Sequence, residues 1–357
     1  MASLLDRLEA EPYGPREDAS FLEQANALTQ AHLAGCAAYG RMWPAWQPAE
    51  CLAELPFVHV GVFKHVALRT EGEGIQHQRV LESSSTSGKG ASQINLDLHS
   101  SALQARSSQS ILASFVGREK RPLLILDSVK SLRRRGGVSA RVAAAMSLQP
   151  FSNSVHFLLA DADDGESMKW DELGKLLAQH DDFLVYGFTW ILWLAWGAQV
   201  QRQAGGMPDE IREALKGKRI HFVHSGGWKK LEAAKLERAE VDRWLLQGLD
   251  PGSAVIDYYG LVEQVGVVYP LCSEGWRHVP VWADVLVRDP LSLACLDEQP
   301  GQLQLINLLA HGAPYHSVLT EDLGRLVPGA CACGRGSRRF ELIGRVPNAE
   351  VRGCANV

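Results

Sequence analysis

A run of hydroxyl residues that leads into two glycines around a lysine has the clearest chemical character in this chain. It lies between Glu82 and Ala91 and reads Ser83-Ser84-Ser85-Thr86-Ser87-Gly88-Lys89-Gly90. Hydroxyls, glycine N–H groups and a lysine together make a receptor for phosphate oxygens. A solvated Ser/Gly linker is the alternative. The run is not a P-loop of the G-x-x-x-x-G-K-[ST] type, because it starts with serine and a glycine follows its lysine.

Two further candidate segments follow predicted strands, and ligands of parallel α/β sheets bind beyond the carboxyl ends of strands. One is Gly226-Gly227-Trp228, where the glycines allow a flat ligand to approach the backbone and the indole offers a stacking face. The other runs from Tyr259 and Gly260 to Glu263, a carboxylate that could hold the Mg²⁺ of a nucleoside triphosphate. The alternative for the first segment is a turn that enters a helix and carries a core tryptophan. The alternative for Glu263 is an acid at a helix N-terminus, where the helix dipole favours it.

A fourth candidate lies near the end of the chain, in the segment 320–324. Its residues predict a turn, and Asp322 could accept hydrogen bonds from two adjacent ribose hydroxyls. Taken alone, the segment is only a turn.

The overall composition is that of an ordinary globular protein and excludes several function classes. The 357 residues are 46% hydrophobic and 22% charged, with a net charge of -5, enough for one large or two modest domains. Beyond the short Arg133-Arg134-Arg135 there is no basic run, so we expect no nucleic-acid partner. The uncharged segment 183–200 reaches the lower length limit of a membrane span, but a strand followed by a buried helix capped by Thr189 explains it equally well. We expect neither a membrane span nor a signal peptide.

The cysteines indicate a reducing compartment. There are seven, unevenly spaced, which favours free thiols of a cytoplasmic protein. Cys331 and Cys333 raise a metal alternative. A zinc site normally uses paired Cys-x-x-Cys elements, and only one Cys-x-Cys is present, so the pattern favours no zinc there.

The elements that must position these residues alternate along the chain. The residue types predict strands at 57–63, 123–127, 155–159, 183–186, 220–223 and 255–259. They predict helices over most of 4–39 and at 100–115, 140–146, 170–179, 211–215 and 231–246. Such alternation is typical of an α/β protein with a largely parallel sheet, while the short strands and turns beyond Val281 predict a smaller β-rich subdomain. We therefore expect an α/β core at 1–280, the β-rich subdomain at 281–345 and a tail at 346–357.

The candidate segments, in this order, resemble the adenylate-forming superfamily of acyl-CoA synthetases and peptide-synthetase adenylation domains. The Ser-rich run is similar to the family's phosphate loop T-S-G-T-T-G, with Ser85 in place of its first glycine. Three further motifs match: the Tyr-Gly-x-x-Glu motif at Tyr259, Gly260 and Glu263, the ribose-binding aspartate at Asp322, and the hinge Gly-Arg at Gly344-Arg345. The resemblance implies a large N-terminal adenylate-forming domain with mainly parallel sheets plus the β-rich subdomain.

A finer resemblance is to the acyl-protein synthetases of the bacterial bioluminescence fatty-acid reductase complex, from about Pro56 onwards. It rests on Ser92-Gln93-Ile94, on the His-x-Gly-Gly-Trp-Lys-Lys loop at 224–230 and on the Arg-Gly-Cys at 352–354. The segment 331–335 is also similar to the phenylacetate-CoA ligase branch. Twelve residues follow Arg345, so we expect the mobile C-terminal domain of ordinary CoA ligases to be lacking. Cys354 would stand on the tail as the acyl-accepting nucleophile.

The resemblance implies an ATP- and Mg²⁺-dependent enzyme that converts a fatty or aromatic carboxylic acid into an acyl-adenylate. The acyl group would pass to Cys354 as a thioester and then to a partner, an acyl reductase-like or carrier protein. The phosphates would contact Ser83, Ser84, Thr86, Ser87, Gly88 and Lys89. Glu263 would hold the metal, residues 226–228 would flank the adenine and acyl pocket, and Asp322 would bind the ribose. Lys89, Arg345 and Cys354 are the catalytic candidates.

Two alternatives stay open at this stage. One is a ligase of the phenylacetate-CoA type that hands the acyl group to CoA or to a carrier protein. The other is a non-catalytic nucleotide- or acyl-binding scaffold with the same fold.

Overall fold

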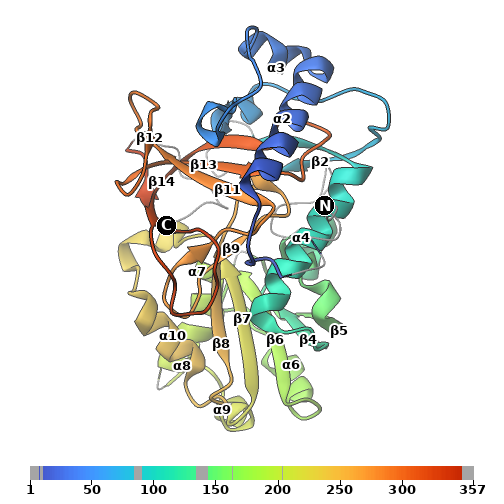
Figure 1. Cartoon of the computed structure of the whole chain (residues 1–357). Helices are drawn as coiled ribbons and strands as arrows, with labels where there is room; N and C mark the ends of the chain where they lie inside the picture. Colours follow the sequence, from blue (N-terminus) through green and yellow to red (C-terminus); the bar gives the residue numbers. More distant parts are fainter. Residues whose placement is uncertain are drawn as a thin grey trace. The chain divides into compact units, whose positions relative to one another are not determined.

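The computed structural model describes residues 8, 11–83, 91–133, 144–162, 164–202 and 204–347 (Figure 1). The chain divides into two compact units, one formed by 1–114 together with 259–357 and the other by 115–258. In the first of these units, Phe21 and Leu28 from the N-terminal part pack with Ile306 from the β-rich part in one core. The expected domain boundaries 1–280, 281–345 and 346–357 stay a prediction.

The unit 115–258 is built on parallel strands in the order β5-β4-β6-β7-β8. Their bounds are Arg121–Ile125 (β4), Ser152–Phe157 (β5), Asp182–Phe188 (β6), Arg219–Ser225 (β7) and Ala254–Tyr259 (β8). The strand order reverses at β4, since β5 and β6 pair with its opposite edges. The predicted α/β architecture with a parallel sheet is confirmed.

Helices pack against one face of this sheet, and their apolar faces form one core with it. They are α6 (Trp170–Leu177), α7 (Thr189–Leu192), the π-helix η5 (Trp193–Gly197), α8 (Ala198–Gln201), α9 (Asp209–Leu215), the 3₁₀ helix η6 (Lys229–Ala234) and α10 (Arg238–Leu246). Helix α6 shows the sequence logic clearly. Asp171 and Glu172 occupy the first turn, where the helix dipole favours acids, and Leu173, Leu176 and Leu177 are buried along one face.

Two local expectations in this unit are wrong. The helix expected at 231–246 is broken, because the chain turns extended at Glu237 between η6 and α10. Thr189 is the first residue of α7 rather than its cap, a position that Phe188 holds. The uncharged segment 183–200 forms β6 followed by α7, η5 and part of α8. Among the described residues, no helix combines the length and the apolar character that crossing a membrane requires.

The other unit contains a mainly antiparallel sheet in the order β10-β15-β14-β13-β11-β12, with β1 parallel to β14. The bounds are Val58–His59 (β1), Arg277–His278 (β10), Ala283–Arg288 (β11), Cys295–Leu296 (β12), Gly301–Asn307 (β13), Ser317–Val327 (β14) and Arg339–Arg345 (β15). The β-rich character predicted beyond Val281 is confirmed. A separate hairpin joins β2 (His77–Glu82) to β3 (Gln93–Asp97).

Helices cover both faces of this sheet. Leu303 and Leu305 of β13 pack in the same cluster as α4 (Leu98–Val116), while Ile306 packs with α2 (Asp18–Gly35). This alternation follows from the two-residue period of a strand. It explains why every residue of β13 is buried, as expected where both faces of a sheet are covered.

Two local expectations in this unit are wrong. The strand expected at 57–63 ends after His59, and the 3₁₀ helix η2 (Val60–Lys64) follows. The helical character expected over most of 4–39 is found at Leu8, in α2 and in a second short helix, α3 (Ala37–Met42), while residues 11–17 are not helical. Residues 320–324 are not a turn but part of the long strand β14, held between β13 and β15.

Buried histidines predict a pH-dependent stability. Burial lowers the pKa of His32 to about 3 and holds the pKa of His316 well below its ordinary value. The two rings lie 4.8 Å apart between centroids, with His311 and Asp97 as the charged neighbours of His32. Both groups are protonated more readily in the unfolded chain. Their contribution to stability is therefore complete above pH 6.5 and is lost as the pH falls toward their folded pKa values.

We expect His32 alone to lower the free energy of unfolding by about 2 kcal/mol between pH 7 and pH 5. Urea denaturation at several pH values in this range measures the slope. Replacing His32 and His316 together with glutamine should make this slope shallower, while burial of His311, which lowers its pKa to about 4, should leave part of it. An unchanged slope after the double replacement would contradict the assignment.

Candidate active site

The strands β2 and β3 hold the two ends of the predicted phosphate loop together. Glu82 pairs with Gln93 in the ladder. Beyond it, the Ser83 N–H donates to the carbonyl of Ser92 at 3.0 Å, and the Ser92 N–H donates to the Ser83 hydroxyl at 2.8 Å. These two hydrogen bonds join the first and last residues of the loop, and the Ser83 O–H can still donate to a phosphate. The residue types alone did not single out Ser92 for this role.

The rest of this loop lies outside the described residues. That applies to the phosphate-binding candidates Ser84, Thr86, Ser87, Gly88 and Lys89, and also to Cys354 on the tail. Their roles stay predictions.

Asp322 is the centre of a buried chain of polar contacts. The Tyr259 hydroxyl donates to Asp322 Oδ2 at 2.8 Å, and Arg345 Nε lies 3.4 Å from Asp322 Oδ1. Arg345 also contacts Glu321 Oε2 through Nη2 at 3.0 Å. Three candidates that the sequence places far apart, Tyr259, Asp322 and Arg345, are thus brought into contact within one unit. Asp322 and Arg345 are direct partners in the β14–β15 register.

The backbone around Asp322 is fixed by its strand and by Thr320. The Asp322 N–H donates to Thr320 Oγ1 at 3.1 Å, and that hydroxyl donates to the carbonyl of Leu303 on β13 at 2.9 Å. The register between β14 and β15 shifts between Leu323 and Gly324. Such a bulge re-aims the neighbouring side chains.

Electrostatics keep Tyr259 a hydrogen-bond donor. Burial, followed by the adjacent Asp322 carboxylate, holds the pKa of Tyr259 well above its ordinary value. The phenol therefore stays protonated at neutral pH and donates to a carboxylate that also faces Arg345. A carboxylate held by a donor on one oxygen and a cation near the other has a fixed orientation, as a ligand for paired hydroxyls requires.

Glu263 lies in a short turn that its neighbour Gln264 anchors. It lies in the one-turn 3₁₀ helix η7 (Val262–Gln264) and is 3% exposed. Gln264 fixes this turn to the β-rich sheet. Its Nε2 donates to the carbonyl of Tyr315 at 2.9 Å, and its Oε1 accepts from Asn307 at 3.0 Å. Among the described residues Glu263 belongs to no cluster of three metal-ligating side chains. That is compatible with Mg²⁺ bound through one carboxylate plus phosphates and water.

In the other unit, the Gly-Gly-Trp segment leaves β7 through a constrained turn. Gly226 has a φ of +79°, a conformation that favours glycine. The Thr189 hydroxyl contacts His224 Nδ1 at 2.9 Å and donates to the carbonyls of Ser225 and Gly226. Thr189 and His224 therefore position this turn. The one sequence signal for this role is that each lies next to the end of a predicted strand.

Trp228 lies 5% exposed in the core of its unit, where its ring centroid is 6.0 Å from that of Trp193. Trp228 therefore packs mainly as a core tryptophan, which was the alternative to a ligand-stacking role. Its role beside a ligand, like those of Gly226, Gly227 and Gly260, stays a prediction.

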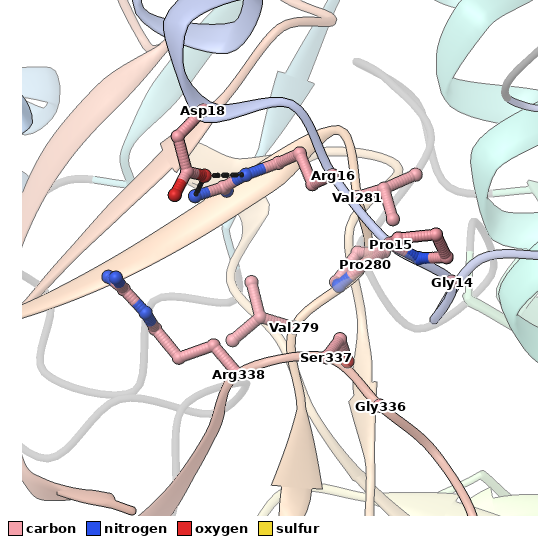
Figure 2. Close-up of a pocket in the computed structure, with 10 residues that line it drawn as sticks. All are labelled: Gly14, Pro15, Arg16, Asp18, Val279, Pro280, Val281, Gly336, Ser337 and Arg338. Atoms are coloured by element: carbon pink, nitrogen blue, oxygen red, sulfur yellow. Dashed lines mark hydrogen bonds and ion pairs between the residues drawn. The ribbon is translucent and has the colours of Figure 1, made fainter.

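A cavity of about 210 Å³ lies elsewhere in the first unit (Figure 2). It is lined by Gly14, Pro15, Arg16, Asp18, Val279, Pro280, Val281, Gly336, Ser337 and Arg338. No predicted site residue is among them. Arg16 Nη2 and Arg338 Nη1 contact the two oxygens of buried Asp284 at 2.6 and 2.8 Å. This carboxylate and Asp18 offset the arginine charges, and the contacts of Arg16 with Ala283 and Asp284 anchor the N-terminal segment on β11.

The fold is that of adenylate-forming CoA ligases. Crystal structures of 2-hydroxyisobutyryl-CoA ligase match it at 15% sequence identity. An open conformation with 2-HIB-AMP and CoA has a TM-score of 0.65 and covers 93% of this chain and 75% of that one. A postadenylation state with R3-HIB-AMP has a TM-score of 0.64 and covers 92% and 68%. No curated protein matches the chain significantly.

The family model for the acyl-protein synthetase LuxE matches residues 48–357. The chain belongs to the LuxE acyl-protein synthetase family, and it is an adenylate-forming ligase. The predicted family resemblance and enzyme class are confirmed.

Proposed function

We propose that the protein uses ATP and Mg²⁺ to activate a carboxylic acid as an acyl-adenylate and then passes the acyl group to Cys354. The observation that carries this proposal is the buried Tyr259–Asp322–Arg345 chain. These contacts orient the carboxylate of Asp322, the residue that the superfamily resemblance assigns to the ribose, and this orientation supports the proposal. Membership of the acyl-protein synthetase family supports the same assignment.

In the first step, a carboxylate oxygen of the acid attacks the α-phosphorus of ATP. The bond from that phosphorus to the bridging oxygen of pyrophosphate breaks, which gives acyl-AMP and pyrophosphate. The protein's part is positioning and charge neutralisation. The Ser-rich loop and Lys89 would contact the phosphates, Asp322 would accept from the ribose hydroxyls, and Glu263 would hold Mg²⁺, which neutralises phosphate charge when bound.

In the second step, the Cys354 thiolate attacks the acyl carbonyl. The carbon–sulfur bond forms, the bond to the AMP oxygen breaks, and AMP leaves with the electron pair. Arg352, two residues before Cys354 in the sequence, would favour the thiolate form. The thioester then passes to a thiol or other nucleophile of an acyl-acceptor protein.

The fold of a CoA ligase favours a second candidate for the acceptor, free CoA or the phosphopantetheine thiol of a carrier protein. The chemistry of the first step is then unchanged, and only the nucleophile of the second differs.

Carboxylate-dependent exchange of labelled pyrophosphate into ATP tests the first step. We expect exchange with at least one acid in a panel of aliphatic and aromatic acids, and none without acid. Intact-protein mass then tests the second step through a gain equal to the acyl group. Exchange without a mass gain would move the assignment to CoA or a carrier protein. No exchange with any acid would overturn the enzyme assignment for this chain and leave a binding scaffold.

A further inference from the structure

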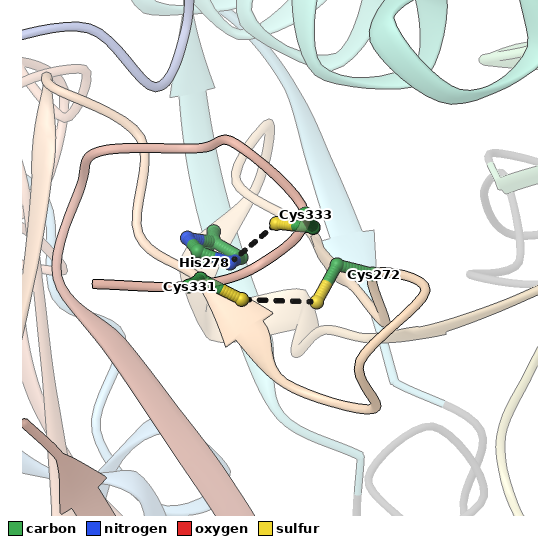
Figure 3. Close-up of side chains that lie close together, drawn as sticks. All are labelled: Cys272, His278, Cys331 and Cys333. Atoms are coloured by element: carbon green, nitrogen blue, oxygen red, sulfur yellow. Dashed lines mark hydrogen bonds between the residues drawn. The ribbon is translucent and has the colours of Figure 1, made fainter. Parts of the chain in front are cut away.

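Four metal-ligating side chains lie close together in the unit formed by 1–114 and 259–357. None of them is a nucleotide-site candidate. They are Cys272, His278, Cys331 and Cys333, and their ligand atoms all lie within 4.8 Å of one another (Figure 3). Cys272 Sγ is 3.9 Å from Cys331 Sγ, and Cys333 Sγ is 3.3 Å from His278 Nε2. All three cysteines are free thiols.

We propose that these four residues bind one structural Zn²⁺. Zinc bonds of about 2.3 Å to sulfur and about 2.0–2.1 Å to nitrogen, in a tetrahedron, imply ligand separations of about 3.8 Å between sulfurs and about 3.6 Å between sulfur and nitrogen. The distances of 3.9 and 3.3 Å lie close to these values. Three cysteines and one histidine fill all four positions. A closed site of this kind stabilises a fold and leaves no position for a substrate.

Two tight turns present the ligands. Cys272 begins a turn in which its N–H donates to the carbonyl of Trp276 at 2.9 Å, and His278 follows in β10. The other turn lies between β14 and β15. There the Gly334 N–H donates to the carbonyl of Cys331 at 3.1 Å, and Gly334 has a φ of +84°. A side chain at Gly334 would strain this conformation. The two turns meet because β10 pairs with β15, where His278 lies opposite Arg339.

The surroundings suit a site with three thiolates. Cys272 and His278 are buried, while Cys331 and Cys333 are partly exposed, so a metal ion can enter from the β14–β15 loop. The guanidinium of Arg335, two residues after Cys333, lies 5.2 Å from the centre of the Tyr13 ring, which itself packs against His278. Zinc with three thiolates carries one negative charge, which this guanidinium offsets. The Tyr13 ring packs edge-on against His278 at 5.9 Å and fixes the imidazole orientation.

The zinc would tie the loop end of the β14–β15 hairpin to β10. Val327 pairs with Arg339 next to the loop, and Asp322 pairs with Arg345 farther along the same hairpin. The metal would therefore stabilise the hairpin that carries the nucleotide-site residues, without contacting the substrate. Because a structural site contributes its binding free energy to folding, loss of the metal should appear first as loss of stability.

Elemental analysis of the purified full-length protein after dialysis against metal-free buffer without a chelator tests this proposal. We expect about one zinc per chain in the wild type, none in Cys331→Ser, and a melting temperature lowered by several degrees in that variant. The matched control is Cys51→Ser, which removes an exposed cysteine outside the cluster and should keep both the zinc and the melting temperature. His278→Cys preserves four ligands and should also retain the metal, which covers the case in which Cys331→Ser fails to fold.

Replacement of the zinc by Co²⁺ gives an independent readout. Tetrahedral cobalt with three thiolates should show visible d–d bands and a near-ultraviolet thiolate-to-cobalt band, both lost in Cys331→Ser. Wild-type protein that binds neither ion would overturn the proposal. So would a Cys272–Cys331 disulfide in place of the metal, or zinc that persists in Cys331→Ser.

Discussion

Cys354→Ala should form acyl-AMP at close to the wild-type rate and yet carry no acyl group. The thiol contributes nothing to attack on the α-phosphorus, so pyrophosphate exchange should stay within about twofold of wild type. Acylation requires the thiolate itself, so the mass gain of the acyl group should fall at least about a hundredfold, to below detection. Intact-protein mass after incubation with ATP and the acid measures the second effect, and exchange measures the first.

The matched controls are Cys51→Ala and Cys295→Ala, which remove exposed cysteines elsewhere in the chain. Both should keep the mass gain. An acyl adduct that persists in Cys354→Ala would place the acceptor at another residue. Transfer to CoA at an unchanged rate in that variant would show that the tail cysteine is not on the reaction path.

Asp322→Asn should raise the KM for ATP by about two orders of magnitude with little change in kcat. Hydrogen bonds from hydroxyls to a carboxylate contribute about 1.5–3 kcal/mol each, and the amide keeps only one acceptor. We expect a loss of about 3 kcal/mol, which corresponds to about a hundredfold. Tyr259→Phe removes the donor to Asp322 Oδ2 but keeps the carboxylate. Its KM should rise less, by about tenfold. Initial rates of pyrophosphate exchange across ATP concentrations give both constants.

Glu341→Gln is the control on the same hairpin, because its carboxylate pairs with Arg325 near the surface. Surface pairs contribute about 0–1 kcal/mol, so neither the melting temperature nor the KM for ATP should change much. If Asp322→Asn keeps a KM within threefold of wild type and melts normally, Asp322 is not the ribose ligand. A large drop in melting temperature with an unchanged KM would assign it a purely structural role.

Short-range patterns predicted the elements of the parallel sheet well. The buried strands β4, β6 and β7 are apolar runs, and the helices between them carry leucines on one face, so composition alone indicates them. The hairpin β2–β3 was missed because β2 is mostly exposed, with polar residues such as His77 and Arg79 in its length. Its pairing with β3, rather than any apolar pattern, makes it a strand.

The segment around Asp322 is a second case in which the residue types alone did not predict a strand. The segment Asp322-Leu323-Gly324 has the residue types of a turn, yet it continues β14 because β13 and β15 pair with both of its edges. The identity of Asp322 as a candidate was readable from the motif. Its contacts with Tyr259 and Arg345 were not, because they join residues 63 and 23 positions apart.

The amino-acid sequence by itself determined the class of this protein, since the order of its motifs and the types of residue at its candidate nucleotide site are local properties. Only the tertiary structure decided which of them meet. The four-residue cysteine–histidine cluster is the clearest case. The Cys-x-Cys at 331–333 is an incomplete zinc motif in the chain, and the pairing of β10 with β15 brings His278 to it, together with Cys272. The proposed metal site depends on distances of a few ångströms between its ligands, and among the described residues the long-range pairing of β10 with β15 brings these ligands together.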